Sequence, residues 1–288
     1  MAAPPDSGER TGFNFFKLPL SVRMAVYLPL VAVILFLLLR QLEFMATYHP
    51  TRYVPGPEWT PPANGEDIWI QVGGQRLHGW FLRARTQPAT STVLFCHGNG
   101  GNLTNVTLVA TALSDHNLDV LIFDYRGYGR SEGKLTDEWG LYSDADAAYD
   151  YLIQQRGVRA ENLVVYGRSL GTTAAIDLAS RRPCKRLIVE SGLSSASDMG
   201  VVTFPWLPIW FHRLSKNKFE STRKIAGVKC PVLVTHGTHD TVIPINQGHK
   251  LYEAAREPKR LVIVAEGDHD LLWSGGSDYL KKLLEFIH

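Results

Sequence analysis

Cysteine is scarce in this sequence, with three residues among 288. Cys96, Cys184 and Cys230 are an odd set, and each lies in or beside an apolar run. No disulfide framework is therefore implied, and ordinary buried thiols are the simpler interpretation. No CxxC pair or Cys/His spacing typical of a metal site occurs, so we predict no metal and no cofactor.

The net charge is also small. The sequence has 30 Lys and Arg residues and 28 Asp and Glu residues, which gives a formal charge of +2. No basic block or basic helix face stands out, so we predict that nucleic acid is not a partner. Hydrophobic residues make up 45% and charged residues 20%, which is typical of a globular protein. The length suits one large domain or at most two. Nothing in these quantities predicts an oligomeric state.

Charge is missing altogether from one long apolar run, Met24 to Leu39. Extended back to Leu18, with Arg23 snorkelling, the run reaches the about twenty residues that a bilayer core requires. Pro29 can kink such a helix but does not forbid it. We predict a tail over residues 1–17, cytoplasmic or disordered, and a transmembrane anchor over residues 18–40.

Two other interpretations of this run are a cleaved signal peptide and a core helix of a soluble protein. Residues 40–47 contain no small-x-small cleavage site, and the run precedes a self-contained domain, so both are less favoured. A slight excess of basic residues before the run places the N-terminus in the cytoplasm and the catalytic domain on the non-cytoplasmic side. These residues are Arg10, Lys17 and Arg23 before the run, against Arg40 and Arg52 after it.

Five prolines between Tyr48 and Asn64 predict an extended linker over residues 41–65, followed by a catalytic domain over residues 66–288. Asp67–Val72 and Arg76–Arg85 read as a hairpin around Gly73-Gly74. Short apolar runs then alternate with helix-length stretches, which predicts an α/β fold with a mostly parallel sheet flanked by helices. The predicted inner strands are 92–96, 120–123, 163–166, 187–189, 232–235 and 261–264.

Residues 191–226 interrupt this alternation after the sixth predicted strand. They contain no clear strand and carry the aromatic run FPWLPIWF at 204–211. We predict a lid over the open edge of the sheet.

The sequence Gly167-Arg168-Ser169-Leu170-Gly171 follows a predicted strand and precedes a helix of small residues. A sharp strand-to-helix turn needs glycines beside the serine, and it lifts the hydroxyl to the top of the sheet. The start of the helix favours developing negative charge there. Ser169 is therefore the predicted nucleophile.

A serine nucleophile needs a base that a carboxylate orients, and in hydrolases built on this turn the acid and then the histidine follow the serine. Asp240 follows the strand at 232–235, and His269 follows the strand at 261–264. Glu190, at the end of the strand after the nucleophile, is a rival acid. Neighbouring Asp268 and Asp270 are expected to shape the loop or stay solvated, and His236 and His239 to pack loops.

Attack by Ser169 creates an oxyanion that backbone amides must stabilise. The Leu170 N–H is one predicted donor. The second is expected in the glycine-rich loop HGNGG at 97–101, where Asn99 is our choice and Gly100 the alternative.

The motifs HGNGG, DYRGYGRS (124–131), GRSLG, HGTHD (236–240) and GDHD (267–270) together resemble the α/β-hydrolase superfamily. Over residues 66–288 the sequence is most similar to the membrane-anchored α/β-hydrolase domain-containing proteins. The resemblance implies a Ser169, Asp240 and His269 triad and a structural role for the 124–131 loop. It also implies substrates such as acyl groups on proteins or membrane lipids. The cysteine cluster of the acylated members is missing.

We therefore predict a membrane-anchored serine hydrolase of acyl or lipid esters that works through an acyl-enzyme. An acyl-protein thioesterase is the alternative, and a serine peptidase or a binding protein without activity is less favoured. Dehalogenase chemistry is disfavoured, because it requires an aspartate where Ser169 stands.

Overall fold

The computed structural model describes residues 15–288. Most of the predicted tail, with Arg10, lies in residues 1–14, outside the described residues. The chain divides into two compact units, Met1–Met45 and Ala46–His288.

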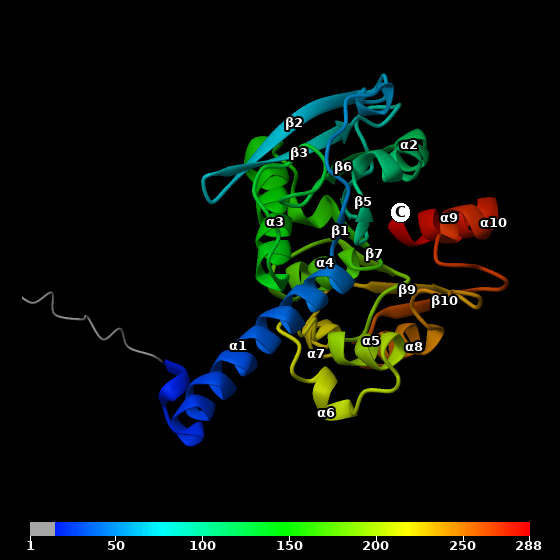
Figure 1. Cartoon of the computed structure of the whole chain (residues 1–288). Coiled ribbons are helices and arrows are strands. Elements are labelled where there is room, and N and C mark those ends of the chain that lie inside the picture. Colours follow the sequence, from blue (N-terminus) through cyan, green and yellow to red (C-terminus); the bar gives the residue numbers. More distant parts are fainter. Residues whose placement is uncertain (1–14) are drawn as a thin grey trace, which may run out of the picture. The chain divides into compact units, whose positions relative to one another are not determined.

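The first unit contains η1 (Phe15–Lys17) and most of helix α1 (Leu20–Thr47), drawn in blue in Figure 1. The 28 residues of α1 include Pro29, and none of them is buried. At 1.5 Å per residue the helix is ~42 Å long, which exceeds the ~30 Å core of a bilayer. It continues past residue 40, where the predicted span ends, because residues 41–47 contain no glycine or proline. Its length and composition suit a membrane span, and they also suit a signal sequence.

The second unit is built on an eight-stranded sheet with the strand order β10-β9-β8-β7-β4-β6-β3-β2 (Figure 1). β2 and β3 form the predicted antiparallel hairpin, β3 is antiparallel to β6, and all other neighbours are parallel. The predicted fold class is thus confirmed. The strands are β2 (Gly65–Val72), β3 (Gln75–Leu82), β4 (Ser91–Cys96), β6 (Leu118–Phe123), β7 (Leu163–Arg168), β8 (Arg186–Glu190), β9 (Val232–Gly237) and β10 (Lys259–Val264).

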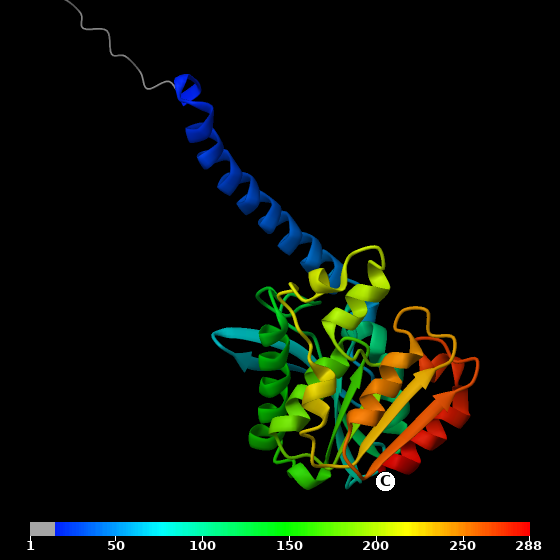
Figure 2. The ribbon, with the colours of Figure 1, turned by 90° about the horizontal axis from the view of Figure 1, so that it is seen from below.

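Helices cover both faces of the sheet, which is why the inner strands are apolar throughout. The amphipathic α2 (Thr107–Asp115) and α10 (Gly276–Ile287) bury Leu113 and Leu283 in one core with strand residues such as Phe95. α3 (Glu138–Asp150), α4 (Gly171–Arg181) and α8 (Ile245–Ala254) are the other long helices, and Figure 2 shows the strands running between helices. The shorter elements are β1 (His49–Pro50), η2 (Pro57–Trp59), β5 (Gly100–Gly101), η3 (Leu103–Val106), η4 (Tyr151–Gln155), η5 (Ala160–Asn162) and α9 (Leu271–Ser274).

Residues 46–65, most of the predicted linker, belong to the second unit. β1 pairs with β5 in parallel, the buried Tyr48 donates its hydroxyl hydrogen to Asn217 Oδ1 at 3.0 Å, and Trp59 joins the core. The prolines prevent long helices and strands in this segment. They do not prevent its aromatic side chains from being buried, and this burial holds the segment on the domain.

The lid segment, residues 191–226, follows β8, the sixth strand of the large sheet in chain order. It contains the helices α5 (Ala196–Thr203), α6 (Ile209–His212) and α7 (Ser221–Ile225) and no strand. The prediction of a non-strand excursion at this point of the fold is therefore confirmed.

Candidate active site

Ser169 lies in the turn between β7 and α4 with a left-handed backbone, at φ 54°. A non-glycine residue in this region costs about 1–3 kcal/mol and persists only where its surroundings hold it. The Ser169 N–H donates to the Glu190 carbonyl at 2.9 Å, and the side chain is almost buried at the N-terminus of α4. The turn therefore presents the hydroxyl where helix dipole and free amides favour an anion.

Glycines make this turn sterically feasible. A Cβ on Gly171 would lie 2.1 Å from the Cys96 carbonyl oxygen, and one on Gly167 would lie 2.6 Å from the Gly171 carbonyl oxygen. A Cβ on Gly98 would lie 3.2 Å from Ser169 Cβ, so the loop after β4 runs directly against the serine. This contact puts the predicted oxyanion loop beside the predicted nucleophile.

His269 and Asp240 are hydrogen-bonded, with 2.8 Å between His269 Nδ1 and Asp240 Oδ2. Burial opposes ionisation of the Asp240 carboxyl. Hydrogen bonds from His236, His269 and the Ile243 N–H outweigh burial and hold the pKa of Asp240 well below its usual range. An ionised carboxylate can only accept, so Nδ1 of His269 carries the hydrogen and Nε2 is left as the basic atom.

Two further links bring the Ser169 and His269 segments together. The Ser191 hydroxyl donates to the His269 carbonyl at 3.1 Å, and Ser191 follows Glu190, whose carbonyl holds the Ser169 N–H. Arg168 Nη1 also lies 3.1 Å from Asp270 Oδ2. The residue before the serine and the residue after the histidine are thus ion-paired.

The loop that carries Asn99 is held by its carbonyl and its side chain. The Asn99 carbonyl accepts from the His49 N–H at 3.1 Å and from the Tyr128 hydroxyl at 3.0 Å, while Asn99 Nδ2 lies 3.0 Å from His49 Nδ1. Within residues 15–288, the N–H groups of Asn99 and Leu170 donate to no backbone carbonyl. Within this range neither of these two amides has a backbone partner, so each is a candidate oxyanion donor, and Gly100 lies opposite His49 in the β1–β5 pairing.

Comparison with known proteins places this architecture in a family. The family described as serine aminopeptidase, S33, matches residues 87–224. Human α/β-hydrolase domain-containing protein 17B is 34% identical over 216 residues, which cover 74% of this chain and 72% of the relative. YfhR of Salmonella typhi is 33% identical over 282 residues, which cover 91% and 94%. The chain belongs to the α/β-hydrolase superfamily.

This hydrolase also shares its fold with the Pyrococcus furiosus esterase Pf2001. The TM-score is 0.66 at 21% identity, and the match covers 84% of this chain and 97% of the esterase. The family makes the protein a serine hydrolase, in agreement with the nucleophile turn.

In this α/β-hydrolase the rival acid, Glu190, is hydrogen-bonded to residues other than His269. Its buried carboxylate accepts from the hydroxyls of Tyr166 and Tyr279, and burial raises its pKa. Of the histidines expected to pack loops, His236 has Nε2 3.3 Å from Asp240 Oδ2 and 2.8 Å from the Ile243 carbonyl. His236 therefore contacts the same carboxylate oxygen of Asp240 as His269 does, a role that its position in the strand does not reveal.

Sequence reasoning missed a contact between two buried residues, one in the predicted oxyanion loop and one in the 124–131 loop. His97 Nε2 is 3.6 Å from Asp124 Oδ1, and His97 Nδ1 is 2.8 Å from the Gly98 carbonyl. Burial lowers the pKa of His97 to about 4 and raises the pKa of Asp124 to about 8, so both are neutral near pH 7. The pair joins the HGNGG and DYRGYGRS loops, and the only local signal for it is that each residue is the first of its motif.

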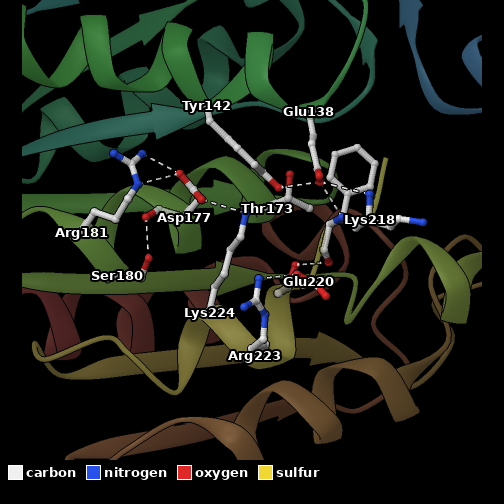
Figure 3. A network of polar contacts seen from close by, with 12 residues as sticks. Glu138, Tyr142, Thr173, Asp177, Ser180, Arg181, Lys218, Glu220, Arg223 and Lys224 are labelled. Carbon is white, nitrogen blue, oxygen red and sulfur yellow. Dashed lines mark hydrogen bonds and ion pairs between the residues drawn. The ribbon is translucent and has the colours of Figure 1, made fainter. Parts of the chain in front are cut away.

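Glu138 at the start of α3 anchors the returning end of the lid segment (Figure 3). Its carboxylate accepts from the N–H groups of Phe219 at 2.6 Å and Lys218 at 3.2 Å, and from the Tyr142 hydroxyl at 3.0 Å. Charge-assisted bonds of this kind, made away from water, are strong and directional. They hold residues 218–219 in one position.

A second contact in Figure 3 fixes α7. Lys224 Nζ lies 2.7 Å from Asp177 Oδ1 on α4 and 3.8 Å from the centre of the Tyr142 ring. Asp177 is paired with Arg181 as well. The C-terminal part of the lid segment, from residue 218 onward, is therefore fixed on α3 and α4. Residues 199–214 carry most of the exposed apolar side chains of the segment.

Proposed function

We propose that this hydrolase is membrane-anchored and cleaves carboxylic esters of lipid or acyl substrates through an acyl-enzyme on Ser169. The observation that carries the proposal is the strained Ser169 turn packed against Gly98, in a fold that also binds His269 Nδ1 to an ionised aspartate and pairs Arg168 with Asp270. The boundaries of the tail and the anchor near residues 17 and 40 are part of the proposal, whereas residues 46–65 pack on the catalytic domain.

Acylation begins when Ser169 Oγ attacks the ester carbonyl and His269 Nε2 takes the hydroxyl proton. The positive charge that forms on His269 is stabilised by Asp240, which also keeps the ring in the required tautomer. The carbonyl oxygen becomes an anion and accepts hydrogen bonds from the N–H groups of Leu170 and Asn99. The protonated His269 then gives its proton to the leaving alcohol.

Deacylation repeats these steps with water in place of the serine hydroxyl. His269 removes a proton from the water, the hydroxide attacks the acyl carbonyl, and Ser169 leaves as the protonated hydroxyl. The products are a carboxylic acid and the enzyme in its starting state. Every proton passes through one nitrogen, so no metal or cofactor is required by this mechanism.

Two features support a substrate that comes from a membrane. α1 is long and apolar enough to span a bilayer. The lid segment carries an aromatic lid surface, which we define as the exposed side chains of Val201, Val202, Phe204, Trp206, Ile209, Trp210 and Leu214. No acidic residue occurs between Met199 and Phe219, whereas Arg213, Lys216 and Lys218 do. Aromatic and aliphatic side chains next to lysine and arginine are typical of segments that lie in a lipid interface.

The test is hydrolysis of a matched series of acyl esters and acyl thioesters from short to long chains, with the full chain in detergent micelles. We expect kcat/KM to rise with chain length, by up to about fourfold for each methylene that becomes buried. Activity confined to the shortest esters would contradict a lipid or acyl-protein substrate. The ester-to-thioester ratio distinguishes the proposed esterase from an acyl-protein thioesterase.

The description of the matching family favours a peptidase as a second candidate. Amino-acid p-nitroanilides therefore belong in the same assay. Faster turnover of these amides than of any ester would replace the esterase proposal with an aminopeptidase.

We expect the aromatic lid surface to enter the interface of vesicles that contain anionic lipid. Tryptophans 206 and 210 are 75% and 62% exposed, and α1 contains no tryptophan, so fluorescence reports on the domain alone. Lipids brominated high on the acyl chain should quench the wild type, and Trp206→Phe/Trp210→Phe should lose most of this quenching.

The matched control is Trp139→Phe/Trp273→Phe, which removes two tryptophans that are 70% and 68% exposed outside the lid segment. Equal loss of quenching in the two double variants would show that the lid segment does not contact the bilayer. Resistance of the wild-type chain to alkaline extraction from membranes tests the anchor independently.

The catalytic domain is proposed to lie on the non-cytoplasmic side, as the distribution of basic residues around α1 favours. Protease protection in sealed membranes measures the side directly. Digestion of the domain from the cytoplasmic face would reverse this part of the proposal.

A further inference from the structure

Two of the three cysteines approach each other at the end of the sheet where strands β8 and β9 begin. Cys184 Sγ and Cys230 Sγ are 3.1 Å apart, only about 1 Å more than the length of a disulfide bond. Both residues are free and partly exposed, whereas Cys96 is fully buried. Pairing of these thiols departs from the expectation of three separate buried cysteines.

The backbone around the two thiols is fixed by the sheet. β8 and β9 are parallel neighbours with Leu187 opposite Val232, and the Leu187 N–H donates to the Pro231 carbonyl at 3.0 Å. Each cysteine lies just before its strand, at the same end of the sheet. The approach of the two sulfur atoms therefore follows from strand pairing, not from two flexible loops.

We propose that Cys184 and Cys230 form a disulfide by thiol–disulfide exchange with an external small-molecule or protein disulfide. The bond would close a loop that contains β8 and the whole lid segment. It does not involve the hydrolytic site, so it adds a covalent modification to the proposed function and does not depend on it.

The different pKa shifts of the two thiols indicate which cysteine attacks the external disulfide first. The Cys184 S–H hydrogen bond, with Arg186 nearby, lowers the pKa of Cys230, while the same contact raises the pKa of Cys184. Cys230 as thiolate attacks one sulfur of the external disulfide and expels the first thiolate. Cys184 then loses its proton and attacks Cys230 Sγ, which expels the second thiolate. The chain loses two hydrogen atoms, and the external disulfide is reduced to two thiols.

The experiment treats the full chain in detergent with oxidised glutathione and then alkylates the denatured protein with N-ethylmaleimide. We expect the number of alkylated cysteines to fall from three to one and a peptide pair joined through Cys184 and Cys230 that dithiothreitol separates. A bond that closes this loop should raise Tm by about 5–15 °C.

Three variants make the result specific. Cys96→Ser should still form the bond, because burial raises the pKa of Cys96 to about 12 and keeps it out of exchange. Cys184→Ser should stop at a glutathione adduct on Cys230, whereas Cys230→Ser lacks the attacking thiol and should form an adduct more slowly, and neither variant should gain Tm. If either serine variant does not fold, the alanine variant replaces it.

Retention of three alkylated cysteines, a bond to Cys96, or separate glutathione adducts on Cys184 and Cys230 would overturn the proposal. A joined peptide without a higher Tm would overturn its stabilising effect. Hydrolysis by the reduced Cys184→Ser variant should equal that of the wild type, so this test and the test of the proposed function fail independently.

Discussion

Ser169→Ala is expected to lower kcat for ester hydrolysis by about 10⁵- to 10⁶-fold, because the variant has no atom that can form the acyl-enzyme. The residual rate would come from the oxyanion donors and substrate binding alone. The loss is measured with the best ester of the chain-length series, together with labelling by a serine-directed fluorophosphonate.

Ser180→Ala is the matched control for this variant. Ser180 lies on α4, the helix that follows Ser169, and its hydroxyl donates to the Asp177 carbonyl at 2.7 Å. We expect this variant to keep its activity and its label. A fluorophosphonate label that persists in Ser169→Ala would assign the nucleophile to another serine, and a wild type that takes no label would favour a binding protein without activity.

Asp240→Asn is expected to lower kcat by about 10⁴-fold. The amide has the size of the carboxylate, but it cannot hold His269 with hydrogen on Nδ1 or stabilise the charged ring.

Glu190→Gln tests the rival acid. Because the Glu190 carboxylate bonds to Tyr166 and Tyr279, we expect this variant to keep kcat within about tenfold of the wild type, the range of a structural hydrogen-bond change. A larger loss in Glu190→Gln than in Asp240→Asn would exchange the two assignments.

The wild type and Asp240→Asn should also differ in how their stability against unfolding depends on pH in acid. The pKa of Asp240 is lowered in the folded state, so its ionised form stabilises the fold above an unfolded pKa of about 3.9. This contribution is lost as the pH falls below that value. The stability advantage of the wild type over Asp240→Asn in urea unfolding should therefore begin to shrink near pH 5, fall steadily down to about pH 3, and continue to fall until the pH passes the lowered pKa of folded Asp240. A constant difference over this range would contradict ionic stabilisation by Asp240.

Local patterns were enough to predict the elements that carry the site. Ser169, Asp240 and His269 each follow a short apolar run, and the carboxyl ends of parallel strands meet at one edge of a sheet. The structure brings His269 and Asp240 into hydrogen-bond contact and packs the Gly98 loop against Ser169, as these positions required. The three catalytic roles themselves remain predictions for the variants above to test.

The residues that sequence reasoning missed act through contacts between distant segments. His97 and Asp124 come from different loops, and Glu138 receives the N–H groups of residues 80 positions further along the chain. Residues 46–65 read as a linker because their prolines break periodicity, yet Tyr48 and Trp59 are buried. No local pattern reports a contact whose partner lies on another element.

The sequence by itself determined the alternation of strands and helices, the nucleophile turn, the apolar N-terminal helix and the aromatic segment of the lid. These depend on spacing along the chain, where hydrophobic period, glycine and proline act directly on the backbone. Only the tertiary structure decided which thiols meet, which acid contacts His269 and which side chains hold the lid segment. Those outcomes depend on strand order and burial, because sheet pairing brings together residues that the sequence separates, and burial then decides which of them carry charge.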